Sequence, residues 1–357
     1  MTENLIEIRQ LNVAFGAQTV VRDLSLDIRP GECLALVGES GSGKSVTAHS
    51  ILQLLPQTGC SATGSVRYRG QELIGASPAT LQQLRGNRIA MIFQEPMTSL
   101  NPLHSVEKQI GETLLLHRGL GGKEAQARIL ELLELVGIQK PRERLKAYPH
   151  QLSGGQRQRV MIAMALACEP ELLIADEPTT ALDVTVQRKI LLLLKSLQQR
   201  LGMSLLLISH DLNLVRRIAQ RVCVMKAGEI VEQADCDTLF NAPRHPYSCE
   251  LLHAEPEGEP LCRDTRETVL EVDHLRVEFQ IGGGLFRRKE YLRAVDGISL
   301  SVQQGKTLGI VGESGSGKST LGQAILRLLD SQGGIRFQGQ ALDGLNQKQL
   351  RLSLIHI

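Results

Sequence analysis

Four short apolar runs in the first part of the chain each end abruptly at polar residues. They cover residues 33–37, 89–93, 172–175 and 205–208. Continuous apolar runs of this length are typical of strands that are buried on both faces of a parallel sheet. The pattern therefore predicts an α/β fold with a mostly parallel sheet.

The polar residues that follow these runs are of the types that bind phosphates and metals. A glycine-rich segment starts at Gly38, and the other three runs lead into Gln94, the pair Asp176 and Glu177, and His210. Parallel sheets bind ligands at the carboxyl ends of their strands. We therefore expect one crevice to collect these side chains as an active site.

An internal repeat indicates a duplicated domain. The segment at 36–45 (LVGESGSGKS) returns at 310–319 as IVGESGSGKS, and the similarity extends to both sides. Residues 254–268 are rich in Glu, Pro and Gly and have no apolar periodicity, which predicts a linker. We expect one complete domain at 1–253 and a partial second copy at 269–357.

Composition and charge change this picture little, but they exclude some classes of protein. The 40 Lys and Arg nearly balance the 38 Asp and Glu, which does not indicate a nucleic-acid binder. The seven Cys include no Cys-x-x-Cys pair, as is typical of reduced thiols. The N-terminus shows no export signal, and every apolar run is far shorter than the ~20 residues of a membrane helix. At a membrane, such a protein is expected to dock rather than to span.

The glycine-rich segment has the spacing of a phosphate-binding loop, Gly-x-x-x-x-Gly-Lys-Ser. Its backbone N–H groups are expected to surround the phosphates, with Lys44 on the β- and γ-phosphates and Ser45 on Mg²⁺. The predicted binding residues are Gly38, Ser40, Gly41, Ser42, Gly43, Lys44 and Ser45, and in the second copy Gly312, Ser314, Gly315, Ser316, Gly317, Lys318, Ser319 and Thr320, with Ser319 also a metal ligand.

The two adjacent acids at a strand end are predicted to divide two tasks. Asp176 is expected to support Mg²⁺, and Glu177 is expected to act as the general base on water. The alternative is a solvated acidic turn. His210 is either a structural histidine or, as its place after the fourth run favours, a contact to phosphate or water.

A second glycine-rich sequence, LSGGQ, precedes a stretch with few helix breakers. Its residues Ser153, Gly154, Gly155 and Gln156 would place exposed N–H groups at a helix start, which is an anion site. It lies too far along the chain to belong to the first phosphate loop by local geometry, so a phosphate on a partner domain is one possibility. A glycine-rich helix cap is the other.

Together these motifs resemble the ATP-binding domain of ABC transporters over residues 5–240. The resemblance implies a P-loop NTPase fold with an antiparallel β subdomain and a helical subdomain. It also implies a head-to-tail dimer in which ATP lies between one domain's phosphate loop and the other's LSGGQ. In such a dimer Phe15 would stack on adenine, unless it is a strand core residue, Gln94 would sense Mg²⁺ and the membrane partner, and Asp183 would contact the opposing domain.

Two further stretches narrow the resemblance to peptide and nickel importers of the tandem Yej type. They are FQEPMTSLNP at 93–102 and the segment at 239–252 with His245, Pro246 and Tyr247. By analogy, the loop at 97–102 and the helices after it would grip two membrane permease subunits. A substrate-binding protein outside the membrane would supply cargo, and the chain would lie peripherally at the cytoplasmic face of the bacterial inner membrane.

The second copy departs from this pattern. No second glutamine, LSGGQ, acidic pair or histidine follows its phosphate loop, and residues 352–357 do not continue the earlier copy convincingly. The expectation is a truncated tandem subunit, in which ATP binding does not depend on missing parts but hydrolysis does. Those parts would come from another chain's first domain or from the missing half.

The function and the role of one basic cluster each have two possible interpretations. A soluble tandem ABC protein acting on ribosomes or DNA competes with a transport ATPase, although the 93–102 and 239–252 segments favour transport. A P-loop kinase would not explain LSGGQ. The cluster Arg287, Arg288 and Lys289 is interpreted as a solvated loop, with anionic lipid as the other possibility.

Overall fold

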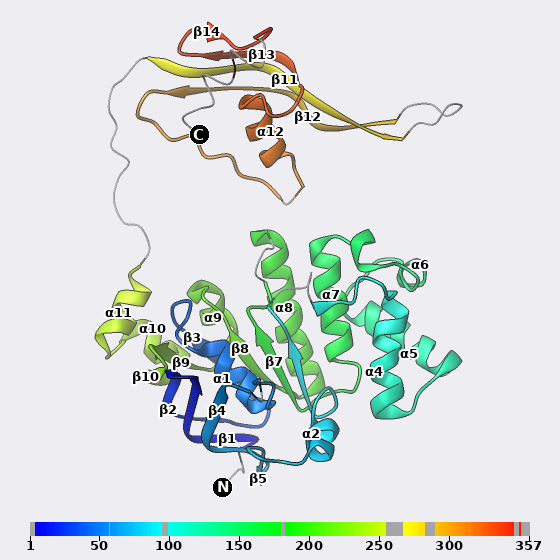
Figure 1. Cartoon of the computed structure of the whole chain (residues 1–357), viewed down its shortest axis with the longest axis vertical. Coiled ribbons are helices and arrows are strands. Elements are labelled where there is room, and N and C mark those ends of the chain that lie inside the picture. Colours follow the sequence, from blue (N-terminus) through cyan, green and yellow to red (C-terminus); the bar gives the residue numbers. More distant parts are fainter. Residues whose placement is uncertain are drawn as a thin grey trace. The chain divides into compact units, whose positions relative to one another are not determined.

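The computed structural model describes residues 4–56, 58–94, 99–179, 183–254, 267–282, 290–313, 315–345 and 350. It divides into two compact units, Met1–Glu255 and Pro256–Ile357. Figure 1 shows the elements of both units. Each unit is described by itself below. No helix in the described part of the chain is long and apolar enough to cross a membrane.

A six-stranded sheet forms the centre of the first unit, in the order β10-β9-β3-β8-β7-β6. All neighbours are parallel except β9 and β10. This confirms the predicted mostly parallel sheet. The strands are β3 (Cys33–Val37), β6 (Ile89–Ile92), β7 (Leu172–Asp176), β8 (Ser204–Ile208), β9 (Arg221–Lys226) and β10 (Glu229–Asp235).

Strand β3 shows why these apolar runs are continuous. Its five residues are all buried, and alternate ones belong to different cores. Ala35 and Val37 face the core that contains most of the helices, whereas Leu34 and Leu36 face the core shared with a second sheet. When both faces of a strand are buried, its sequence does not alternate between apolar and polar residues.

The second sheet of this unit is antiparallel, with strand order β2-β1-β4-β5. It consists of β1 (Ile6–Phe15), β2 (Gln18–Ile28), β4 (Cys60–Tyr68) and β5 (Gln71–Glu72). The helix α1 (Lys44–Ile51) contributes Ala48 and Ile51 to the core between the two sheets. The helix that follows the phosphate loop is thereby fixed on two sides.

The remaining helices belong mostly to the other core. α4, α5 and α7 pack on one another, in cyan to green in Figure 1, and form the expected helical subdomain with α6. The helices are α2 (Pro78–Leu84), α4 (Val106–Arg118), α5 (Gly122–Leu135), α6 (Pro141–Arg144), α7 (Gly154–Ala165), α8 (Val184–Leu201), α9 (Leu212–Ile218), α10 (Cys236–Asn241) and α11 (Pro246–Leu252).

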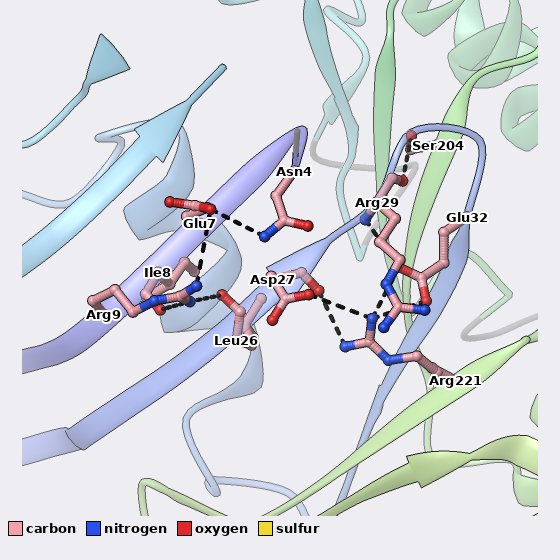
Figure 2. A network of polar contacts seen from close by, with 10 residues as sticks. All are labelled: Asn4, Glu7, Ile8, Arg9, Leu26, Asp27, Arg29, Glu32, Ser204 and Arg221. Carbon is pink, nitrogen blue, oxygen red and sulfur yellow. Dashed lines mark hydrogen bonds and ion pairs between the residues drawn. The ribbon is translucent and has the colours of Figure 1, made fainter. Parts of the chain in front are cut away.

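A network of ion pairs around the buried Arg221 joins the two sheets at the amino ends of β3, β8 and β9 (Figure 2). Arg221 Nη1 lies 3.1 Å from Glu32 and 3.5 Å from Asp27 at the end of β2, and only 7% of the Arg221 and Glu32 side chains is exposed. Ser204 Oγ accepts from the Gly31 N–H and donates to the Arg29 carbonyl. Parallel strands bind ligands at their other ends, so this network lies away from the expected ligand edge.

In its described residues, the second unit has a four-stranded antiparallel sheet, in the order β12-β11-β13-β14, together with the helix α12. Its core is small and holds Val272, Leu275, Ile335 and Leu321, among others. The elements are β11 (Thr268–Gly282), β12 (Glu290–Gln303), α12 (Lys318–Ile325), β13 (Gln332–Phe337) and β14 (Gln340–Ala341). β11 begins at the last residue of the predicted linker.

The apolar segment before the second phosphate loop is not a strand. Leu308, Ile310 and Val311 are 46%, 45% and 93% exposed, whereas the corresponding β3 is fully buried. In the first unit β3 pairs with β8 and β9, which lie later in the chain. No such strands occur in the described part of the second unit, so this segment has no partners there.

Several predicted features lie outside the described residues. These are most of the linker at 254–268, the loop residues 95–98, the basic cluster at 287–289, Ser314 and the C-terminal residues 352–357.

Candidate functional site

The first phosphate loop connects β3 to α1 and is shaped by two glycines. Gly38 has φ +147°, and a Cβ there would collide with the Met225 carbonyl at the end of β9. Gly43 has φ +100°, and its Cβ would lie 2.9 Å from the Val20 carbonyl oxygen. Both positions combine positive φ with close backbone approach, which only glycine permits. The loop is thereby held against β9 and β2.

Lys44 lies inside this loop and is only 5% exposed. Its Nζ donates to the carbonyl oxygens of Gly38 and Glu39, both at 2.8 Å. Burial lowers the pKa of Lys44, and the nearby carboxylates of Glu177 and Asp176 partly offset that effect. A buried ammonium within a ring of backbone groups is suited to bind phosphate oxygens.

Ser45 and Asp176 meet where α1 begins and β7 ends. The Ser45 hydroxyl donates to Asp176 Oδ1 at 3.0 Å, and Asp176 is 3% exposed. Burial raises the pKa of Asp176, although the bond from Ser45 opposes the rise. One hydroxyl and one carboxylate fit Mg²⁺, which takes few protein ligands beside phosphate oxygens and water. Among the described residues, no three His, Cys, Asp or Glu side chains form a fuller metal site.

Glu177 is the meeting point of the other predicted side chains. Its Oε2 accepts from Gln94 Nε2 at 3.2 Å, and His210 Nδ1 lies 3.4 Å away. Glu177 also has φ +44°, a left-handed conformation that is uncommon outside glycine, and its N–H donates to the Ile208 carbonyl. Strain of this kind concentrates at functional sites. The structure thus brings together all the side chains expected at these strand ends.

The LSGGQ residues form the start of α7. Ser153 Oγ accepts from the Gln156 N–H, and Gln156 Oε1 accepts from the Ser153 N–H, which is a capping box. Ser153 and Gly154 are exposed, and Gly155 lies close to Val186 of α8. The structure therefore contains the helix cap, while the anion site on a partner domain stays a prediction.

Phe15 and Asp183 each have a structural place in the first unit. Phe15 is the last residue of β1, pairs with Gln18 and Cys60, and packs partly buried against the core between the sheets. Asp183 is the N-cap of α8 and accepts from the Val186 N–H at 2.9 Å. The stacking role of Phe15 and the intersubunit role of Asp183 stay predictions.

The second phosphate loop repeats the backbone geometry of the first. Gly312, Gly315 and Gly317 have φ +159°, +81° and +92°, against +147°, +81° and +100° in the first loop. Lys318 Nζ donates to the carbonyls of Gly312 and Glu313 at 2.8 and 2.7 Å. Ser316, Ser319 and Thr320 occupy the expected positions, but in the described part of this unit no carboxylate bonds to Ser319 as Asp176 does to Ser45.

One contact to the first loop was missed from the sequence. The hydroxyl of Tyr247, in α11, accepts a hydrogen bond from the Glu39 N–H at 3.1 Å. The sequence signal was the His245-Pro246-Tyr247 motif, which by itself indicates only a proline-flanked turn.

A family model described as ABC transporter matches residues 21–180 and 295–356. The peptidoglycan transport ATP-binding protein YejF of Agrobacterium fabrum is 54% identical, covering 98% of this chain and 65% of that protein. YejF of Escherichia coli K12, an uncharacterized ABC transporter ATP-binding protein, is 55% identical, covering 98% and 68%.

A glutathione import ATP-binding protein, GsiA of Salmonella typhimurium, is 45% identical, covering 98% of this chain and 62% of that protein. The chain thus spans about two thirds of the length of these relatives. Two of them are named for transport or import, and the third is described as an ABC transporter protein. The alternative of a protein acting on ribosomes or DNA therefore gains no support from them.

A solved structure matches the fold. It is a dimer of the ATP-binding cassette MJ0796 in a post-hydrolysis state with ADP and Pi, with a TM-score of 0.58 and 30% identity. The match covers 65% of this chain and 98% of that one. The expected P-loop NTPase fold of the ABC type, with its antiparallel and helical parts, is confirmed.

Proposed function

The chain belongs to the ABC transporter family, and from that premise we propose that its first unit binds ATP with Mg²⁺ and hydrolyses it to drive import across a membrane. The observation that carries this proposal is the convergence on Glu177 and Lys44. The phosphate loop with Lys44 and Ser45, the two acids, the Gln94 amide and the His210 imidazole come from four separate segments and meet at one sheet edge.

The proposed roles follow from the contacts. Lys44 would bind the β- and γ-phosphates, and the loop N–H groups would hold the remaining phosphate oxygens. Ser45 and Asp176 would hold Mg²⁺, with Gln94 beside them, and the ion would neutralise charge on the phosphates. These groups orient the triphosphate for attack at the γ-phosphate.

Glu177 would accept the proton of the attacking water. Its carboxylate is 16% exposed and is oriented by the Gln94 amide and the His210 ring. A base held in this way can act on a water in line with the γ-phosphate. Gln94 and His210 would share the positioning of that water, which gives each a catalytic role in this proposal.

A second protomer would complete the site. Ser153, Gly154, Gly155 and Gln156 lie at an exposed helix start, where N–H groups favour anions. We propose that they close over ATP bound in a facing unit, with Phe15 on the adenine and Asp183 at the contact. The solved relative is a dimer, which supports this arrangement.

The proposed cargo is an oligopeptide, a dipeptide or a related small molecule. The curated relatives include proteins named for peptidoglycan transport and for glutathione import, both with peptide chemistry. Import of this kind would require two permease subunits in the membrane and a substrate-binding protein outside it. The chain itself would be peripheral, at the cytoplasmic face.

The test counts nucleotide sites with a fluorescent ATP analogue and the full chain, with Mg²⁺ or with EDTA. Two loops predict two Mg²⁺-dependent sites per chain. Lys44→Ala and Lys318→Ala should each remove one, the double variant should remove both, and Lys195→Ala on α8 should remove none. Absence of Mg²⁺-dependent binding in the unchanged chain would overturn the proposal.

A further inference from the structure

The helix α11 and the turn before it are fastened to the central sheet. The Glu232 carboxylate, on β10, accepts from the N–H groups of Arg244 and His245 at 2.9 and 3.0 Å. His245 Nδ1 then accepts from the Tyr247 N–H at 3.2 Å, which caps α11. This places the Tyr247 ring at a defined position beside β9.

The Tyr247 side chain is buried and reaches the first phosphate loop. It is 2% exposed, and Lys226 Nζ, at the end of β9, lies 4.2 Å from the ring centroid. The hydroxyl accepts from the Glu39 N–H. Lys226 follows Met225, whose carbonyl defines the close approach to Gly38. Tyr247 therefore contacts both the loop and the strand against which the loop packs.

One peptide group is held from both ends by these contacts. The Gly38 carbonyl and the Glu39 N–H belong to the same peptide unit. Its oxygen accepts from Lys44 Nζ, and its N–H donates to the Tyr247 hydroxyl. Rotation of this peptide would break both bonds, so its orientation and the direction of Lys44 are coupled.

We propose that Tyr247 is a positioning residue for the first nucleotide site: its hydroxyl fixes the Gly38–Glu39 peptide and so directs Lys44 toward phosphate. This rests on the proposed ATP binding. The proposed contact connects α11 to the nucleotide site, so a change in the position of α11 would alter nucleotide affinity. The second loop differs in its surroundings, since Lys318 makes the same two bonds there while Gly312 and Glu313 are exposed.

The test isolates the first site in a Lys318→Ala chain. Tyr247→Phe keeps the ring and its contact with Lys226 and removes only the hydroxyl. Loss of one hydrogen bond of this kind should weaken ATP binding about three- to tenfold. The matched control is Tyr68→Phe, another buried tyrosine of the same unit, which should change affinity less than about twofold.

A second measurement reports on the peptide itself. Amide hydrogen exchange of a fragment containing Glu39 should be faster in Tyr247→Phe than in Tyr68→Phe, without nucleotide. Affinities are compared at a temperature where circular dichroism shows both variants folded. Equal ATP affinity in the two variants, or equal exchange, would overturn the proposal. Failure of the Lys318→Ala parent to bind ATP would instead overturn the proposed function.

Discussion

The Gln94 amide donates a hydrogen bond to the Glu177 carboxylate at 3.2 Å. Gln94 follows β6 and Glu177 follows β7, so the bond joins two neighbouring strand ends across the site. The resemblance to ABC transporters implies that Gln94 senses the metal and the membrane partner. The hydrogen bond would then let that partner influence the orientation of the catalytic base directly.

Replacing the base should separate binding from turnover. In Glu177→Gln the amide cannot accept the proton of water, so ATP hydrolysis should fall by about 10²- to 10⁴-fold. ATP affinity should be kept, because Lys44 and Ser45 are unchanged. Phosphate release and ATP-analogue binding measure the two effects, with the exposed Glu131→Gln as control. Normal turnover by Glu177→Gln would refute the assignment of the base.

Much of this site could be predicted because the signals are local. The apolar runs are continuous since both faces of each strand are buried, and the residues after them share one sheet edge by the rule for parallel strands. Three strand bounds differ by one residue from the apolar runs: β7 also includes Asp176, β8 also includes Ser204, and β6 lacks Phe93. Phe93 was expected in a strand, but β6 ends at Ile92, and Phe93 is 41% exposed with its ring near that of His49.

Other features depend on contacts between distant parts of the chain and had no local signal. The Tyr247–Glu39 bond needs α11 to return to the loop, and Arg221 meets Glu32 only through the pairing of β9 with β3. The left-handed backbone at Glu177 is likewise imposed by its surroundings. Sequence patterns indicate which faces are buried, but not which distant polar groups meet.

The negative charge of Asp176 should lower the stability of the fold at neutral pH, although it is needed to hold Mg²⁺. Burial raises its pKa, so the folded protein binds this proton more tightly than the unfolded chain does. Stability from this group is therefore highest at low pH and falls as pH rises from 3.8 through the folded-state pKa. At pH 7.5 the buried charge costs free energy.

Asp176→Asn removes that charge and should raise the unfolding temperature at pH 7.5 in EDTA. In the Lys318→Ala chain, where only the first site is left, added Mg²⁺ and ATP should stabilise the protein by mass action, but not once Asp176→Asn is added. Thermal unfolding in EDTA and in Mg²⁺ with ATP measures both effects. The control is Asp23→Asn, which replaces an exposed carboxylate of β2. A lower unfolding temperature of Asp176→Asn in EDTA would contradict the prediction.

The first phosphate loop should not tolerate a side chain at Gly43. In Gly43→Ala the new Cβ meets the Val20 carbonyl at 2.9 Å in a left-handed conformation, so the loop must shift away from β2. ATP affinity at this site should fall by more than about tenfold. Gly75→Ala has a similar positive φ but no atom within 4 Å, and it should lose only about 1–2 kcal/mol of stability. ATP titration of both variants in the Lys318→Ala chain distinguishes displacement of the loop from general backbone strain. Equal ATP affinities of the Gly43→Ala and Gly75→Ala chains would exclude displacement of the loop.

The ion pair at the opposite end of the sheet should affect folding alone. Arg221→Met leaves Glu32 buried without its partner, which should cost about 3–5 kcal/mol of unfolding free energy. The double variant Glu32→Gln/Arg221→Met removes both charges and should recover part of that loss, because a pair of neutral side chains costs less than one buried charge. Guanidinium unfolding of the unchanged chain, both single variants and the double variant measures the coupling. ATP affinity under folding conditions should stay the same, since the network lies at the amino ends of β3, β8 and β9. A cost below about 1 kcal/mol for Arg221→Met would mean that Glu32 is hydrated or protonated once Arg221 is gone.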